Sequence, residues 1–529
     1  MRYFLVAVLI LMMNMLHAQT TKPVPQDWHY LDYTTDGYYG ISLKQAYNLL
    51  KNKKSNTVIV AVIDSGIDTL QPDSKPVLWH NPKEIPNNKI DDDGNGLVDD
   101  YFGWNYLGAP DGENLAMSIS DEYRTYHRFK KEFDNKKADE IPQNLSWQFR
   151  EWNRAKQRLE AGQTNAEKQI ATVRQNFKTV NQANAAMQEI TGKKVFDLKD
   201  IDSLTPNAAT KDIINLWKDL LGDRPGNNES YIKGFETYKN GLEEDLTKLT
   251  TPPDEARNNL LKDDGYNIST THYGNHNLST HSGYHGTSVS SIIGAVRGNK
   301  EGIDGIADNV KIMMIRGILG KDEFDKDVAL SIRYAVDHGA KVINMSFGKY
   351  ISPDKRWVDE AIEYALSKDV VLVHAAGNDA SDNDTIDNYP SAQTINGKAL
   401  PNLIQVGASG DPAVGGLVAP FSNYGKKMVD VFAPGMKIRC AIAGAGTQEA
   451  SGTSLASPIV AGIAALLRSY FPDLKATEIV DIIKKSGTSL DQKVIKPGTA
   501  NELVNLSELC NTGKIVNAAN AVKLAMTYK

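Results

Sequence analysis

Short runs of consecutive apolar residues are spread along the chain and alternate with amphipathic stretches. The apolar runs lie at 58–63, 310–315, 342–345, 370–374 and 403–407. Runs of this length that are rich in β-branched residues are typical of strands buried on both faces of a parallel sheet. Apolar residues at helical spacing over 327–338 and 357–366 lie between the runs. The alternation predicts an α/β fold, with helices on both faces of a parallel sheet.

A long middle segment, 105–270, has a different character. It is rich in Lys, Glu, Asn and Gln, and its apolar residues follow helical spacing in several stretches separated by prolines. These stretches cover 145–159, 170–190, 207–221 and 231–249. We expect an all-helical insertion of four or five helices in this segment.

Three polar motifs lie at the ends of predicted strands or helices. Asp64 ends the 58–63 run, at the sheet edge where α/β proteins place their ligands. His285 begins a His-Gly-Thr-Ser sequence in front of an apolar stretch. Ser454 lies in a Gly-Thr-Ser turn before an apolar helix, and Pro458 in the first turn is compatible with that helix start. Each motif alone is also compatible with a turn or a capped helix.

Together the three motifs occur in the order Asp, His, Ser, which is the order of the subtilisin triad. They resemble the subtilisin-like serine peptidases (subtilases). The resemblance implies a three-layer parallel-sheet fold, in which the 105–270 insertion separates the Asp and His motifs. It also implies that Ser454 attacks the scissile carbonyl, that His285 transfers the proton, and that Asp64 orients His285.

The resemblance extends to other residues. The amide of Asn378, which follows a predicted strand, corresponds to an oxyanion-hole donor, together with the backbone N–H of Ser454. The expected walls of the primary substrate pocket are Ser346, Phe347 and Gly348 on one side and Ala375, Ala376 and Gly377 on the other. A peptide substrate would bind as an added strand. Many subtilases carry a second His where this chain has Ser288, which is not a triad position.

These motifs predict a serine endopeptidase acting on protein or peptide substrates through an acyl-enzyme. Two alternatives stay open. One is a non-catalytic binding protein on the same fold. The other is a peptide ligase or cyclase that uses the same acyl-enzyme. The resemblance implies no cofactor for catalysis.

The N-terminus predicts export. Residues 1–18 combine one Arg, a short apolar run and a small residue at the end, as in a secretory signal peptide. There is no second apolar stretch long enough for a bilayer and no Cys at the cleavage point, so we expect a secreted or periplasmic protein without a membrane anchor. The catalytic domain is expected in two parts, 28–104 and 271–529. About ten residues between Ala18 and Trp28 are too few for a folded prodomain.

Composition changes this picture little. The chain is 41% hydrophobic and 23% charged, with a net charge of −6. This argues against a nucleic-acid partner. The two cysteines, Cys440 and Cys510, could form a disulfide in an exported protein, although sequence alone does not show that they are close.

An acidic loop suggests structural calcium. Its oxygen ligands would be Asp91, Asp93, Asn95, the backbone of Leu97, and Asp99, as at the start of an EF-type loop. Position 12 is Phe102 rather than Glu, and Asp100 could supply the missing carboxylate. The alternative is a solvated acidic turn. Asp73 also resembles a subtilase calcium ligand.

The role of the insertion stays open between a stabilising decoration, a lid or built-in inhibitor, and a docking arm for a partner protein. Four histidines, His272, His276, His281 and His285, lie close together in sequence. We interpret them as part of a polar loop at the rim of the active site rather than as a transition-metal site.

Overall fold

The computed structural model describes residues 24–116, 119–222, 226–254, 256–279, 284–320 and 323–528. The predicted signal peptide, 1–18, and His281 lie outside the described residues. None of the described helices combines the length and the apolar character that a bilayer-spanning segment needs.

A nine-stranded sheet with the order β10-β13-β7-β6-β5-β4-β1-β3-β2 forms the centre of the molecule. Apart from the antiparallel β10–β13 pair, its neighbouring strands are parallel. The strands are β1 (Val58–Asp64), β2 (Gly103–Asn105), β3 (Val310–Arg316), β4 (Val342–Met345), β5 (Val371–Ala375), β6 (Leu403–Ser409), β7 (Val431–Pro434), β10 (Thr488–Ser489) and β13 (Lys514–Ile515). Two small antiparallel pairs, β8 (Ile438–Ala441) with β9 (Thr447–Ala450) and β11 (Val494–Ile495) with β12 (Leu503–Val504), complete the strands.

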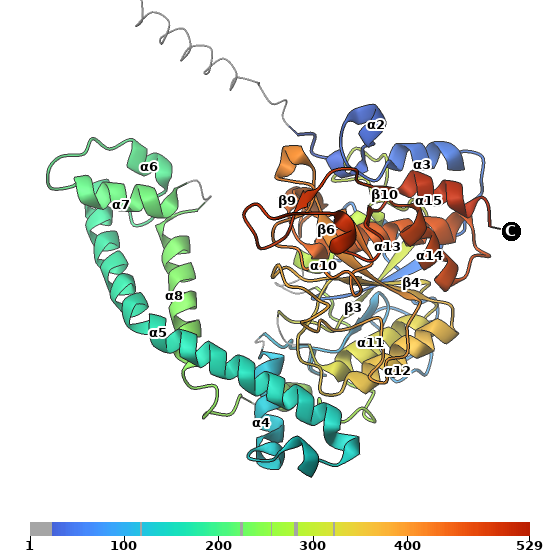
Figure 1. The fold of residues 1–529 in the computed structure, drawn as a ribbon, viewed down its shortest axis with the longest axis horizontal. Coiled ribbons are helices and arrows are strands. Elements are labelled where there is room, and N and C mark those ends of the chain that lie inside the picture. Colours follow the sequence, from blue (N-terminus) through green and yellow to red (C-terminus); the bar gives the residue numbers. More distant parts are fainter. Residues whose placement is uncertain are drawn as a thin grey trace, which may run out of the picture.

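Helices cover both faces of the sheet, as the sequence predicted (Figure 1). One face carries α3 (Leu43–Leu50), α10 (Tyr284–Gly294), α13 (Thr453–Tyr470), α14 (Ala476–Ser486) and α15 (Ala518–Ala525); the other carries α11 (Asp325–Asp337) and α12 (Lys355–Ser367). Along β1, Val60 and Val62 point into the first hydrophobic cluster, and Ala61 and Ile63 into the second. The strand is therefore buried on both faces, which explains its continuous apolar run.

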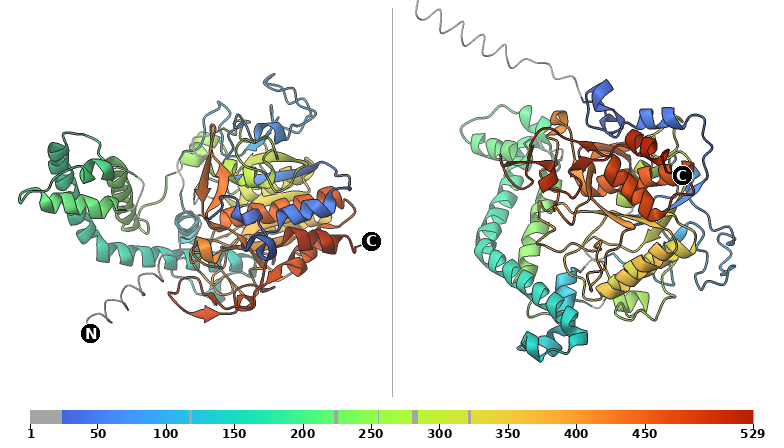
Figure 2. Two further views of the ribbon diagram at one scale, coloured as in Figure 1. Left: turned by 90° about the horizontal axis from the view of Figure 1, so that it is seen from above. Right: turned by 45° about the vertical axis from the view of Figure 1, so that its right-hand side comes forward.

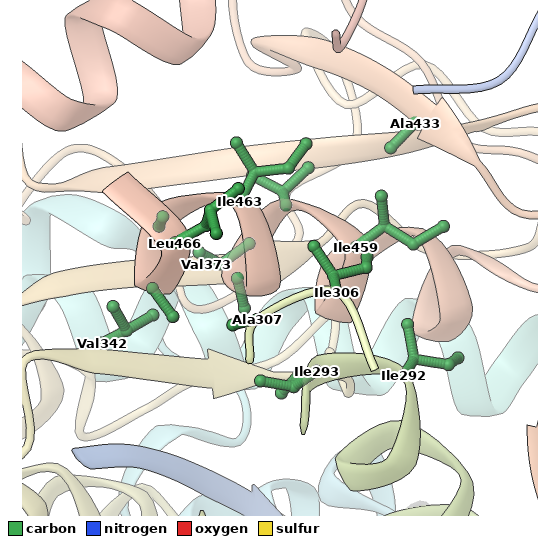
Figure 3. Close-up of a cluster of buried hydrophobic side chains, with 14 of the residues drawn as sticks. Ile292, Ile293, Ile306, Ala307, Val342, Val373, Ala433, Ile459, Ile463 and Leu466 are labelled. Carbon is green, nitrogen blue, oxygen red and sulfur yellow. The ribbon is translucent and has the colours of Figure 1, made fainter. Parts of the chain in front are cut away.

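The larger core forms where α10 and α13 pack on the sheet. Ile292 and Ile293 of α10 meet Ile459 and Ile463 of α13, with Val373 of β5 beside them (Figure 3). This packing fixes the start of each helix relative to the strand ends, and the polar motifs lie at those starts.

The segment between β2 and α10 is helical. It contains α4 (Asp121–Phe133), α5 (Ser146–Thr191), α6 (Leu198–Asp202), α7 (Lys211–Leu221), α8 (Asn228–Asp245) and α9 (Ala256–Leu261). The stretches at 145–159 and 170–190, separate in the apolar pattern, belong to one 46-residue helix, α5. We call residues 146–245, from α5 through α8, the arm; Figures 1 and 2 show it extending from the body, with α6 and α7 at its far end.

The two cysteines are free thiols. Cys440 is buried in the main core and Cys510 in a separate hydrophobic cluster beside β7 and β13. The disulfide that the sequence allowed is therefore not formed.

Candidate active site

Asp64 and His285 are in direct contact. Asp64 is the last residue of β1, and only 3% of its surface is exposed. Nδ1 of His285 lies 2.9 Å from each oxygen of the Asp64 carboxylate. The carboxylate raises the pKa of His285, and partial desolvation of the ring opposes this shift. With Nδ1 bound to Asp64 as a donor, Nε2 is the ring nitrogen that can accept a proton.

A glycine allows this contact. A Cβ on Gly286, the residue after His285, would lie 2.1 Å from the carbonyl oxygen of Gly66. Any larger residue would push the start of α10 away from the end of β1. The His-Gly pair in the sequence therefore has a steric reason.

Ser454 is the second residue of α13 and is half-buried. Its Oγ donates to the carbonyl of Ser346 at 3.2 Å, and Oγ of Ser346 donates to the carbonyl of Ser454 at 2.8 Å. Because a hydroxyl carries one proton, Ser454 does not donate to His285 in this arrangement. A rotation of the Ser454 side chain is needed to form that bond, and such bonds often tighten only when substrate is present.

The amide of Asn378 has a fixed orientation. Its Oδ1 accepts from the backbone N–H of Thr453 at 2.8 Å and from the Thr453 hydroxyl at 3.0 Å. The oxygen is therefore occupied, and the exposed side chain keeps its NH₂ group available as a donor. Together with the N–H groups at the start of α13, this arrangement can stabilise a developing oxyanion.

Asn423 supports the Asn378 loop. Its Oδ1 accepts from the backbone N–H groups of Asp379 and Ser381 at 2.9 and 3.0 Å. A Cβ on Gly377 (φ +108°) would lie 2.4 Å from Nδ2 of Asn423. Neither periodicity nor a recognised motif marked Asn423 in the sequence.

The expected substrate walls follow two adjacent strands. Ser346, Phe347 and Gly348 come directly after β4, and Ala375, Ala376 and Gly377 lie at the end of β5. Asn388 connects the two walls: its Nδ2 donates to the carbonyl of Ala376 at 2.8 Å, and its Oδ1 lies 2.6 Å from where a Cβ on Gly348 would be. No motif or periodicity marked Asn388 in the sequence.

A buried arginine lies behind Asp64. Arg316, the last residue of β3, is 1% exposed and donates through Nε to the carbonyl of Ser65 at 3.1 Å. It also donates to Oδ1 of Asn105 and to the carbonyls of Leu107 and Leu115. The run at 310–315 predicted the strand, but not that its next residue would support the site.

A separate cluster of carboxylates could hold a cation. Oxygens of Glu84, Asp93 and Asp100 lie within 4.8 Å of one another, the only such group of potential metal ligands in the described ranges. Burial raises the pKa of Glu84 and of Asp100. Oε2 of Glu84, a residue that is 5% exposed, is buried and has no hydrogen-bond partner among the described residues.

The cluster differs from the predicted ligand set. Asp93 belongs to it, but Asp91 accepts from the N–H groups of Gly94, Asn95 and Gly96, and Asp99 accepts from those of Asn88 and Lys89. Oδ1 of Asn95 accepts from the N–H of Leu97, whose side chain is buried in the core. Oxygens of Asp93 and Asp100 also accept hydrogen bonds, from Asn81 and Asn95, but they face the Glu84 carboxylate, which joins the cluster from outside the predicted loop.

Asp73 lies apart from this cluster. Its carboxylate accepts from Nδ2 of Asn299 at 2.7 Å and from the N–H of Ile303 at 2.8 Å. Protein donors therefore occupy both oxygens at the position where the resemblance implied a calcium ion. Among the histidines, His272 packs against Gly96.

Comparison with known proteins gives consistent matches. The model of the Subtilase family matches residues 55–503. The chain is 40% identical over 186 residues to the thermophilic serine proteinase of Bacillus sp. strain AK1, covering 35% of this chain and 42% of that protein. It is 38% identical over 187 residues to thermitase of Thermoactinomyces vulgaris, covering 35% of this chain and 61% of thermitase.

Solved structures give looser matches. A protease from Pseudoalteromonas arctica covers 95% of this chain and 99% of its own, with 19% identity and a TM-score of 0.45. A cold-adapted subtilisin-like serine proteinase covers 48% of this chain and 80% of its own, with 25% identity and a TM-score of 0.37. The chain spans 42% of the length of the AK1 proteinase and 61% of the length of thermitase, so it matches only part of these relatives.

Proposed function

This chain belongs to the subtilase family of serine peptidases, and from that membership we propose that it is an exported endopeptidase that hydrolyses peptide bonds. The observation that carries the proposal is the bifurcated contact of His285 Nδ1 with both oxygens of Asp64, at the same end of the sheet as Ser454 and Asn378. Four chemically matched groups at this edge supply a base, its orienter, a nucleophile and an oxyanion donor.

Each group has one task in the proposed reaction. The Ser454 hydroxyl rotates away from Ser346 and transfers its proton to Nε2 of His285 as its oxygen attacks the substrate carbonyl. Asp64 stabilises the imidazolium that forms, and His285 then donates the proton to the leaving amine. The Asn378 amide and the N–H of Ser454 stabilise the oxyanion. Water hydrolyses the acyl-enzyme by the same steps in reverse.

The substrate is proposed to bind as an extended strand. Its backbone would lie along Ser346–Gly348, and the side chain before the scissile bond would enter between that wall and Ala375–Gly377. In this proposal 28–104 and 271–529 form the catalytic domain, and 105–270 is an insertion into it. Protein or peptide substrates are the partners that this arrangement suits.

Export is proposed from residues 1–18, interpreted as a signal peptide. One of the relatives is named a cell wall-associated protease, from Bacillus subtilis. Sequencing the N-terminus of the mature protein from culture medium or periplasm tests this point. A mature chain that retains Met1 inside the cell would contradict it.

We also propose that Glu84, Asp93 and Asp100 hold a structural Ca²⁺ ion. Three carboxylates at close range, one with a buried and unpartnered oxygen, suit a hard cation with oxygen ligands. The ion would neutralise charge that burial makes costly, and it would tie Glu84 to the 91–100 loop. It has no role in the proposed reaction.

The decisive experiment is mass spectrometry of the wild type and of Ser454→Ala after treatment with a fluorophosphonate. We expect an adduct on Ser454 in the wild type, none in the variant, and cleavage of added peptides by the wild type only. Product masses separate hydrolysis from ligation, because a ligated or cyclised product lacks the added water. Absence of an adduct in the wild type would favour a binding protein on this fold.

A further inference from the structure

The base of the insertion is fixed to the segment that follows the substrate wall. Ile351, three residues beyond Gly348, is fully buried in a cluster with Tyr126 and Phe129 of α4 and Trp152 of α5. Glu151 of α5, which has no exposed surface, accepts from the N–H of Ser352 at 2.9 Å. The insertion and the wall therefore form one packed unit.

A groove of about 710 Å³ lies between the base of the insertion and the body. On the body side it is lined by Gly348, the last residue of the expected substrate wall, by Tyr350, and by Asp379, the residue after Asn378. On the insertion side it is lined by Glu122 of α4, Arg158 and Ala161 of α5, and Asp245 at the end of α8. The groove thus begins where the primary pocket ends, and helices of the insertion form its far wall.

The groove carries an excess of negative charge. Three cations line it, and each is paired: Arg158 with Glu122 at 2.8 Å, Lys248 with Asp245 at 2.8 Å, and Lys349 with Asp121 at 3.1 Å. Two further carboxylates, Glu323 and Asp379, also line it. Arg124, just outside the lining, also pairs with Asp121 at 2.7 Å, and Glu323 is buried. The exposed Asp379 therefore supplies the excess negative charge that faces the groove, and this charge favours positively charged ligands.

We propose that this groove is a distal substrate subsite that binds basic side chains of the polypeptide, several residues N-terminal to the scissile bond. The identity of the ligand rests on the proposed function. The leaving amine must reach His285, so the C-terminal half of a substrate lies on the His285 side. The N-terminal half then continues along Ser346–Gly348 and enters the groove. The helical insertion, in this view, supplies half of a specificity site.

The test measures binding, so it does not depend on turnover. Fluorescein-labelled peptides that differ only in the fourth to sixth residues before the expected cut, three Arg or three Glu, are titrated into full-length Ser454→Ala. We expect the Arg peptide to bind several-fold more tightly than the Glu peptide. The preference should shrink at high salt, because exposed charges are screened.

Two variants in the same background locate the effect. Asp245→Asn should weaken binding of the Arg peptide about two- to fivefold, as expected for one exposed ion pair. Ala161→Trp, at an exposed position of α5 that lines the groove, should abolish the preference by filling the space. The matched controls are Glu243→Gln, which removes a charge from α8 outside the groove lining, and Ala185→Trp, on an exposed position far along α5; both should bind like the parent.

Equal affinity for the two peptides, a preference for Glu, or the same loss in Ala185→Trp as in Ala161→Trp would overturn the proposal. Fluorophosphonate labelling of the wild type is scored in parallel. Labelling without an Arg preference contradicts the subsite alone. An Arg preference without labelling contradicts the peptidase function and leaves the groove as a binding site for basic peptides.

Discussion

Arg316 lies opposite Asp64 in the parallel register of β1 and β3, and its guanidinium donates to the carbonyl of Ser65. Among the described residues, the hydrogen-bond acceptors of Arg316 are neutral oxygens. Burial lowers its pKa to about 10, so the side chain is still a cation at neutral pH. A buried positive charge thus lies on the strand beside the one that ends in Asp64, and it is bonded to the residue after Asp64.

This relationship predicts that Arg316→Met raises the pKa of His285, because Asp64 then acts on the imidazolium without an opposing charge. The acidic limb of a kcat/KM profile should move to higher pH, whereas Arg316→Lys should keep it near the wild-type position. Arg316→Met should also lower the Tm, since each buried carbonyl left without a donor costs about 1–3 kcal/mol. Unchanged pH limbs in both variants, measured at temperatures where both are folded, would contradict the electrostatic role.

The contact of His285 with Asp64 predicts the pH dependence of the wild type. His285 must be neutral to accept the proton of Ser454, and Asp64 raises its pKa. Activity should therefore fall as pH decreases through a pKa above the ordinary histidine value. Asp64→Asn should reduce kcat by about 10⁴-fold and move the residual limb to lower pH. If the activity of the wild type falls only below the ordinary histidine pKa, a group other than His285 controls the acidic limb of the pH profile.

Asn378 offers a test in which the local structure is retained. Asn378→Asp keeps an oxygen for the N–H and hydroxyl of Thr453 but replaces the donor NH₂ with a second oxygen. We expect kcat to fall about 10²- to 10³-fold with little change in KM. Circular dichroism and Tm serve as controls for folding. A variant with wild-type kcat would remove Asn378 from the oxyanion site.

The acidic cluster predicts calcium-dependent stability. EDTA should lower the Tm of the wild type, and added Ca²⁺ should restore it. Glu84→Gln should reduce this response, because it removes a carboxylate whose Oε2 has no protein partner. Asp92→Asn changes a carboxylate of the same loop outside the cluster and should keep the response to EDTA. A wild-type melting curve insensitive to both reagents would exclude the proposed ion.

The sequence predicts the position of a residue well where that position depends only on the helix or strand that contains the residue. The run at 58–63 predicts a buried strand, and the geometry of α/β sheets then predicts that Asp64 lies at the ligand-binding edge. The α/β fold class was confirmed as well. It could be predicted because strands covered on both faces of a sheet need continuous apolar runs.

Residues whose role depends on distant partners could not be predicted. Arg316 supports the site because it lies beside Asp64 in the sheet and donates to the loop at 105–115. Asn423 supports the Asn378 loop, which is more than forty residues away in the chain. Glu84 joins Asp93 and Asp100 only after the chain has folded back. The continuous α5 was also missed, because its two halves bury different stripes, one against α4 and one against α8.

The length of α5 gives the insertion a mechanical property. A helix of 46 residues is about 70 Å long, and one end is bound through Glu151 to the segment beside the substrate wall. Figure 1 shows that this helix is curved, but a small rotation at the bound end still moves the far end by a larger distance if the helix is rigid. The arm therefore amplifies small movements of the substrate wall. Energy transfer between one fluorophore near α6 and another on the body would report these movements as a change in the distance between the two dyes.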